Sequence, residues 1–258
     1  MGHVIAFVPA TGGVGASTLG AAVAVRAAAA ERTTCAVDLD LLTGRTEVVF
    51  GAEREPGWRW DRLGRVEGIV DGRALAGRLP SARGVALLSH GSTGGLGEVG
   101  ETGEKGTVAA RVDRLVDVVT GLARAHDVTV LDLPRDDRIL RAALALCDAV
   151  VLVLGSQPTQ IASGARTVAL LRGLADVGTP GAPRLEPWVV LRGARNDADL
   201  EDVVMDELDV SVVDFLRDDA RCVDDLVRGT PPGVRGRGPV TEVADRLLLR
   251  LVGVERAA

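Results

Sequence analysis

The sequence is poor in aromatic residues and in lysine. The first shortage excludes a core built on aromatic side chains, and the second leaves few positions for a catalytic lysine. The 258 residues include no tyrosine, three phenylalanines and three tryptophans, so the core must be built mainly from valine, leucine and alanine. Lys105 is the only lysine, which leaves arginine to supply almost all of the 30 basic side chains. Hydrophobic residues make up 47% of the chain, a composition that suits a buried parallel sheet covered by alanine-rich helices.

The sequence also has few cysteines, no long apolar run and no excess of positive charge. Cys35, Cys147 and Cys222 show no metal-ligand spacing, so we expect buried free thiols in a reducing cytoplasm. The longest apolar run is far shorter than the roughly 20 residues that a membrane span needs, and no signal peptide precedes the first expected strand. The net charge of −6 argues against general nucleic-acid binding. We therefore expect a soluble, cytoplasmic chain.

Apolar runs typical of strands alternate with helical segments along the sequence. The expected strands are 3–10, 34–40, 84–90, 127–134, 148–155 and 186–193, with a short element at 210–216. The expected helices are 17–32, 107–126, 163–178 and 241–253, with another between the strands 127–134 and 148–155. This alternation predicts a mostly parallel sheet with right-handed crossovers and helices on both faces. We find no domain boundary and expect a single domain over residues 1–258.

Residues 51–110 interrupt this alternation. We expect residues 51–83 to form a helical insert broken by glycines. Residues 91–106 are glycine-rich and lack apolar periodicity, which predicts a mobile loop. Trp58 and Trp60 lie in the insert, where local packing is favoured over a role as an anchor for a partner.

A glycine-rich segment, GGVGAST at residues 12–18, lies between the first expected strand and helix. This order forms an anion site, because glycines let the backbone approach the ligand and the helix start points N–H groups at phosphate. In an ordinary P-loop, lysine stands at the position of Ala16, while Ser17 would hold Mg²⁺. The segment therefore has the frame of a phosphate loop without its cation.

Two other interpretations of this segment are a Rossmann dinucleotide site and a tight turn without a ligand. The Rossmann pattern would need a third glycine at Thr18, although Asp38 and Asp40 follow at about the spacing of a ribose-binding acid. Asp132, at the end of the apolar run VTVLD, favours the P-loop, because a Walker-B carboxylate orients Mg²⁺ from that position. A Rossmann oxidoreductase stays a minor alternative, since no candidate acid or base for substrate chemistry is present.

Together these segments resemble the MinD/ParA class of P-loop ATPases, whose deviant phosphate loop reads K-G-G-x-G-K-[ST]-T. TGGVGAST (11–18) matches that loop, VDLDLLTG (37–44) the switch region and VTVLDLPR (128–135) Walker B. The resemblance covers nearly the whole chain. Residues 57–91 and the motif DLPR look most like the CpaE/TadZ branch of pilus-localising proteins and its actinobacterial relatives called septum site-determining proteins. The resemblance implies a three-layer, P-loop NTPase-like (SIMIBI) α/β fold.

The resemblance also implies the roles of individual residues. The nucleotide contacts that it implies are Thr11, Gly12, Gly13, Val14, Gly15, Ala16, Ser17, Thr18 and Arg192. It implies a metal shell of Ser17, Asp38 and Asp132, with Asp40 as the catalytic carboxylate that places the attacking water. Thr11 and Ala16 stand where the family has its two lysines, and Arg192 stands where an adenine-reading asparagine is expected. Arg135, just past Walker B, is the nearest arginine that could substitute for a lysine, although a surface role is favoured for it.

Two functional hypotheses follow from these departures. In the first, the chain is a homodimeric spatial-positioning protein that binds ATP or ADP with Mg²⁺ weakly and hydrolyses ATP slowly or not at all. It would recruit pilus, secretion or division proteins to the pole or septum, without specific nucleic-acid binding and with membrane association that is at most indirect or weak. In the second, it is a scaffold dimer that binds no nucleotide. Whether the chain is an enzyme stays open at this point.

Overall fold

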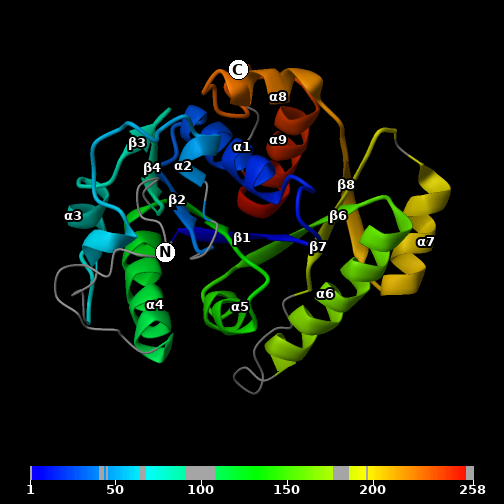
Figure 1. Cartoon of the computed structure of the whole chain (residues 1–258), viewed down its shortest axis with the longest axis horizontal. Coiled ribbons are helices and arrows are strands. Elements are labelled where there is room, and N and C mark those ends of the chain that lie inside the picture. Colours follow the sequence, from blue (N-terminus) through cyan, green and yellow to red (C-terminus); the bar gives the residue numbers. More distant parts are fainter. Residues whose placement is uncertain are drawn as a thin grey trace.

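The computed structural model describes residues 2–40, 44, 46–63, 68–90, 108–176, 186–195 and 197–253, with the backbone alone for 108–111 and 175–176. The described residues form one eight-stranded sheet in the order β3-β4-β2-β5-β1-β6-β7-β8 (Figure 1). The strands are β1 (His3–Pro9), β2 (Thr34–Asp38), β3 (Ser81–Ala82), β4 (Val85–Leu88), β5 (Val128–Asp132), β6 (Ala149–Gly155), β7 (Trp188–Gly193) and β8 (Ser211–Arg217). Every neighbouring pair is parallel except β3 and β4, which confirms the predicted sheet.

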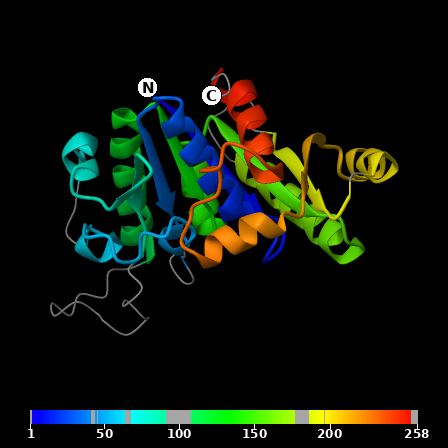
Figure 2. The ribbon, with the colours of Figure 1, turned by 90° about the horizontal axis from the view of Figure 1, so that it is seen from above.

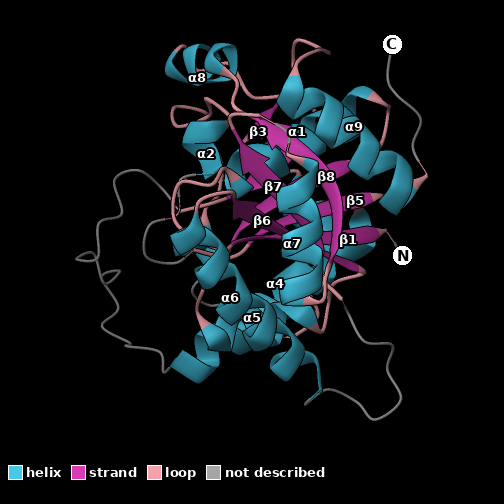
Figure 3. Ribbon diagram, turned by 90° about the vertical axis from the view of Figure 1, so that its right-hand side faces the viewer, coloured by secondary structure: helices cyan, strands magenta, loops and turns pink. Residues whose placement is uncertain are grey.

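Helices cover both faces of this sheet, as Figure 3 shows. The helices are α1 (Ala16–Ala29), α2 (Thr46–Val49), α3 (Gly72–Ala76), α4 (Val108–Ala125), α5 (Asp137–Leu144), α6 (Pro158–Asp176), α7 (Ala198–Leu208), α8 (Ala220–Val227) and α9 (Pro239–Val252), with a 3-10 turn η1 (Trp60–Leu63). α4, α5, α6 and α7 pack on one face. α1 and α9 pack on the other, and α8 lies beside them (Figure 2).

The central strand β1 is buried on both sides, which explains its continuous apolar sequence. Val4, Ala6 and Val8 face the α4–α7 layer, whereas Ile5 and Phe7 face α1. Gly20 lets α1 approach β1 closely, because a Cβ at this position would lie 3.1 Å from Cδ2 of Phe7. The start of α1 is thereby held close to the end of β1, where the glycine loop connects them.

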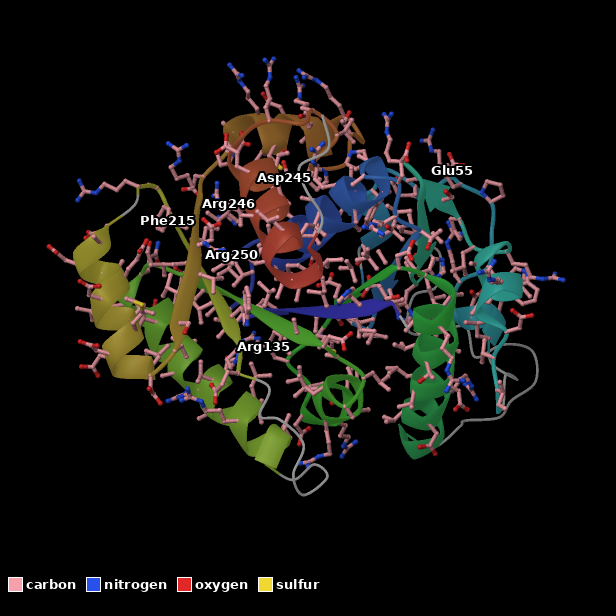
Figure 4. All side chains as sticks on the ribbon, turned by 180° about the vertical axis from the view of Figure 1, so that it is seen from behind. Glu55, Arg135, Phe215, Asp245, Arg246 and Arg250 are labelled. Carbon is pink, nitrogen blue, oxygen red and sulfur yellow. The ribbon has the colours of Figure 1, made fainter. Side chains whose placement is uncertain are left out.

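The C-terminal helix α9 packs on the domain. Val243 and Leu247 are buried against α1, and an almost fully buried ion pair joins Arg26 of α1 to Asp245 at 2.7 Å. On the other side of α9, the guanidinium groups of Arg246 and Arg250 reach β8 (Figure 4). Within the described residues, none of the helices is both long enough and apolar enough to cross a membrane.

Some elements differ from the sequence prediction. α7 and α8 were not anticipated; each starts at an aspartate, Asp197 and Asp219, whose side chain accepts hydrogen bonds from the first-turn backbone. α6 begins at Pro158 and not at residue 163. The described parts of residues 51–83 hold only the turn η1, the five-residue α3 and the short strand β3, so the insert is mostly irregular. The segment 91–106 expected to be mobile lies outside the described residues.

The topology brings one set of loops together. The chain leaves β1 toward β2 on one side of the sheet, and later runs from β6 to β7 and β8 on the other side. The order therefore reverses at β1, and ligands of open α/β sheets bind beside the carboxyl ends of strands at such a switch point. The glycine loop, Asp38, Asp132 and Arg192 all follow or end strands at this edge.

Candidate functional site

The loop between β1 and α1 has the backbone shape of an anion cradle. Gly13 and Gly15 have φ angles of 78° and 90°, which residues with side chains rarely adopt. Gly12 and Gly13 face open space, since a Cβ built on either would meet no atom within 4 Å. Gly15 caps α1, and no side chain accepts from its first-turn N–H groups. Those donors therefore remain for an anionic ligand.

Thr11 and Ala16 stand at the two positions where the family has lysines. Thr11 places a hydroxyl there, and Ala16 a methyl group. The Oγ1 atom of Thr11 is buried and has no hydrogen-bond partner. Ala16 is 3% exposed and packs in the core beneath the loop, as does Val14. Residues 10–18 contain no basic side chain, so a bound phosphate would receive backbone N–H groups from the loop but no positive charge from it.

The predicted metal-binding residues lie together beside this loop. Asp38 and Asp132 are register partners at the ends of β2 and β5. Ser17, in the first turn of α1, lies close enough to Asp132 for its hydroxyl to lower the pKa of that carboxyl group. Ser17, Asp38 and Asp132 are therefore brought to one place by three separate elements.

Thr46 joins the two carboxylates, and the sequence reasoning missed it. Its N–H donates to Oδ2 of Asp38 at 3.0 Å, and its Oγ1 donates to Oδ2 of Asp132 at 3.1 Å. The backbone N–H of Asp40 donates to Oδ1 of Asp38 at 3.0 Å. Only a threonine soon after a strand-end acidic pair could have suggested this role, and that signal is too common to be informative without the fold.

The two carboxylates lie in an environment that disfavours negative charge. Burial, and then the charge of Asp38, raise the pKa of Asp132 to about 7, although hydrogen bonds from Ser17 and Thr46 lower it. Burial also raises the pKa of Asp38. His90 is close enough to favour the ionised form of Asp38, but burial lowers the pKa of His90 itself. A cation would relieve this repulsion.

These residues fit Mg²⁺ held in part by a nucleotide. In the described part of the chain, no three His, Cys, Asp or Glu side chains are grouped so that they could hold a metal ion. Mg²⁺ commonly binds through one or two carboxylates, with waters and phosphate oxygens completing its shell. Ser17, Asp38 and Asp132 would hold the ion, which when bound would neutralise charge on phosphate oxygens. The orphaned hydroxyl of Thr11 and the open glycine cradle fit the phosphates.

The predicted catalytic residue Asp40 lies at the same edge, just past β2. Its negative charge contributes to the raised pKa of Asp132, so the two carboxylates are near one another. Its carbonyl accepts from the N–H of Gly44 at 2.9 Å. Residues 41–43 of the matched switch region lie outside the described residues.

The stacked rings of Trp60 and His90 lie beside the end of β2. Nε1 of Trp60 donates to the backbone carbonyl of Asp38 at 2.8 Å, and the Trp60 ring stacks on His90 with 6.2 Å between ring centroids. For Trp60, the sequence favours local packing over a role as an anchor for a partner. The packing interpretation is correct for Trp60, and its contact shows that the irregular insert helps to position the acidic pair.

Two arginines contact the loop from different sides. Nη1 of Arg192, near the end of β7, donates to the carbonyl of Gly13 at 3.1 Å, and Nε pairs with Asp218 at 3.2 Å. Nη1 of Arg135 (labelled in Figure 4) donates to the carbonyl of Ala10 at a longer 3.4 Å. Arg135 is exposed, whereas the Arg192 side chain is 30% exposed. Arg192 is therefore the more firmly held of the two.

Sequence comparison finds relatives but no assigned activity. No protein-family model matches the chain. Two proteins of Mycobacterium tuberculosis, from strains CDC 1551 and H37Rv and both described as uncharacterized, are 31% identical to it over 248 residues. The match covers 96% of this chain and 63% of each relative, so the chain spans less than two thirds of their length.

Structural comparison defines the fold. A ParA family ATPase from Chlorobium tepidum superposes with a TM-score of 0.69 at 16% identity, covering 95% of this chain and 97% of that one. MinD in the MinC:MinD cell division complex of Aquifex aeolicus gives 0.69 at 16% identity, covering 97% and 96%. The septum site-determining protein MinD of Pyrococcus horikoshii, complexed with Mg-ADP, gives 0.64 at 17% identity, covering 96% of both. The chain has the fold of the MinD/ParA P-loop ATPases.

Proposed function

We propose that the chain is a MinD/ParA-like spatial-positioning protein that binds Mg-ATP weakly through a degenerate phosphate loop. The observation that carries this proposal is the assembly of Ser17, Asp38 and Asp132 beside an open glycine cradle. Two neighbouring carboxylates in a desolvated position cost stability when both are ionised, and the cation of a Mg-nucleotide would offset that cost. A structural relative that carries Mg-ADP, the Pyrococcus horikoshii MinD, supports the choice of ligand.

Hydrolysis is proposed to be slow or absent. Phosphoryl transfer depends on positioning and on charge stabilisation, and the positions of both family lysines hold uncharged residues, Thr11 and Ala16. Removing one preorganised stabilising group from an active site typically costs about 10²–10³ in rate. Asp40 would orient water if any turnover occurs.

The biological role follows from the same resemblance. We propose a single-domain ATPase-like unit of the CpaE/TadZ type, cytoplasmic and homodimeric, that recruits pilus, secretion or division proteins at the pole or septum. The Aquifex aeolicus MinD was solved with its partner MinC, which illustrates a protein-recruiting role for this fold. Proteins of Mycobacterium tuberculosis with similar sequence give the proposal a place where it can be tested in cells.

The alternative is a scaffold dimer that binds no nucleotide. The uncharged Thr11 and Ala16, and the hydrogen bond that ties Arg192 to Gly13, favour this alternative. The hydrogen bond from Thr46 to Asp132, and the placement of Ser17 near the same carboxyl group, oppose it, because keeping an ionisable group with a raised pKa there costs stability unless a cation binds.

Binding of a fluorescent ATP analogue to three variants separates the two functions. Ser17→Ala and Asp132→Ala should each lower Mg²⁺-dependent affinity by on the order of tenfold or more, because each removes one ligand or its hydrogen-bond partner. Asp202→Ala, on the exposed side of α7, should bind as the unmodified chain does. Equal affinity in all of these proteins, with and without Mg²⁺, would reject the proposed Mg²⁺-dependent site, and no binding by the unmodified chain would favour the scaffold.

A further inference from the structure

The guanidinium group of Arg192 lies against the backbone of the glycine loop, which has no basic side chain of its own. Nη1 lies 3.1 Å from the carbonyl oxygen of Gly13 and 2.8 Å from where a Cβ on Gly15 would lie. The guanidinium is therefore packed against the loop backbone itself, directly over a glycine that has no side chain to exclude it. This contact joins residues separated by 179 positions in the sequence.

The guanidinium retains hydrogen-bonding capacity in this position. It has five N–H donors, of which the Gly13 carbonyl and the Asp218 carboxylate each engage one in the described structure. The Asp218 side chain is 59% exposed, so water screens its charge and it neutralises Arg192 only in part. The remaining donors and a large share of the positive charge are free to meet an anion, and a planar guanidinium matches phosphate oxygens well.

We propose that Arg192 supplies from β7 the positive charge that the phosphate loop lacks, and contacts the polyphosphate chain of the bound nucleotide. The inference rests on the proposed function and deepens it. Asp218 is a positioning residue in this arrangement, because its carboxylate fixes Nε and thereby aims the guanidinium at the loop. The position that was expected to read the base would thus bind phosphate.

Arg135 is the competing source of charge, and the geometry favours Arg192. Arg135 is exposed and makes one hydrogen bond to the loop, at 3.4 Å, to the carbonyl of Ala10. Arg192 is less exposed, makes the shorter bond and is held by a second group, Asp218. Holding a flexible side chain in place before binding reduces the entropy lost on binding.

The test measures binding of Mg-ATP, adenosine and inorganic tripolyphosphate to a set of Arg192 variants by calorimetry. Arg192→Gln keeps a donor for the Gly13 carbonyl and loses the charge, whereas Arg192→Lys keeps the charge. We expect Arg192→Gln to lower affinity for Mg-ATP and tripolyphosphate by on the order of 10- to 100-fold, with adenosine unchanged. Arg192→Lys should retain most of the affinity, and Arg195→Ala, an exposed arginine three residues on, should retain all of it.

A rescue variant guards against an indirect structural effect. Adding Ala16→Lys to Arg192→Gln supplies a cation at the start of α1 and, provided that thermal unfolding shows the double variant to be folded, should recover affinity for tripolyphosphate. Unchanged affinity in Arg192→Gln, or a loss in Arg135→Ala alone, would overturn the assignment to Arg192 while leaving the proposed function standing. Tripolyphosphate binding that depends on Arg192, without any ATP binding, would support the assignment and reject the proposed function. An unmodified chain that binds neither ligand at millimolar concentration would overturn both.

Discussion

Asp38 and Asp132 are register partners on adjacent parallel strands, and the single residue Thr46 donates a hydrogen bond to each of them. Burial raises the pKa of both carboxyl groups, and the charge of Asp38 raises the pKa of Asp132 further. The charge of Asp38 thus disfavours ionisation of Asp132 at the edge of the sheet where the glycine loop leaves β1. The pair is therefore the clearest physical sign of a cation-dependent site.

The raised pKa of Asp132 predicts an unusual dependence of stability on pH. Its folded-state pKa of about 7 lies above its ordinary value of 3.8, so the native state keeps a proton that the unfolded chain has lost. The stability that this proton confers is fully present below about pH 4 and is lost as the pH rises to about 7. The penalty above pH 7 is roughly 4 kcal/mol by the usual conversion of pKa differences.

Asp132→Asn should remove that penalty. Urea denaturation without nucleotide should show the variant to be more stable than the unmodified chain at pH 8, with the difference shrinking toward pH 4. The physical reason is that asparagine stays neutral at every pH in this range. A variant equally stable or less stable at pH 8 would mean that the Asp132 carboxylate is well stabilised without a metal ion.

Thr46→Val should weaken the site without disturbing the core. Valine keeps the shape and the backbone N–H that reaches Asp38, but it removes the hydroxyl that donates to Asp132. We expect a loss of about 1–3 kcal/mol in stability where Asp132 is ionised, and weaker Mg²⁺-dependent nucleotide binding. Thr129→Val is the matched control: the Thr129 hydroxyl on β5 is buried without a partner, so its removal should be neutral or stabilising. Similar losses in both variants would argue against the bridging role of Thr46.

Gly15→Ala should damage the loop, and Gly12→Ala should not. Gly15 has a φ of 90°, and an added Cβ would lie 2.8 Å from Nη1 of Arg192. A left-handed conformation alone costs an alanine roughly 1–2 kcal/mol. Gly12 has no positive φ and no atom near its Cβ position. Thermal unfolding should therefore separate the two variants by several degrees, and equal melting temperatures would show that the loop backbone adapts freely.

The Arg26–Asp245 ion pair is predicted to fix α1 against α9. Both side chains are at least nine-tenths buried, and two hydrogen bonds join them. Asp245→Ala leaves a buried guanidinium without its main partner and should cost about 3–5 kcal/mol. The double change of Arg26→Met with Asp245→Leu should recover much of that loss, because it removes both charges. A double variant as unstable as the single one would indicate that other contacts of these residues dominate.

Much of the fold could be predicted because its signals are local. The apolar run of β1 and the strand-end position of Asp132 can be read from neighbouring residues alone, and the sheet confirms both. The starts of α7 and α8 follow the capping residues Asp197 and Asp219, a local signal that the sequence contains. The insert was harder, because its few regular elements are short and depend on packing against β2 and α4.

The hydrogen bonds within the site could not be predicted, because they join residues that are far apart in the sequence. Thr46 reaches Asp132 across 86 positions, and Arg192 reaches Gly13 across 179. Such contacts depend on strand order, which the sequence constrains only through the rules of parallel sheets. The sequence showed which charges were missing from the loop, and the structure was needed to find the arginine that faces it.

The most direct test of the account is calorimetric titration of the purified chain with ATP and ADP, with and without Mg²⁺, while light scattering follows its mass. The account predicts ATP binding that requires Mg²⁺ and is accompanied by a shift from monomer to dimer. Absence of binding at millimolar nucleotide, with a mass that nucleotide does not change, would contradict it and identify the glycine loop as a relic.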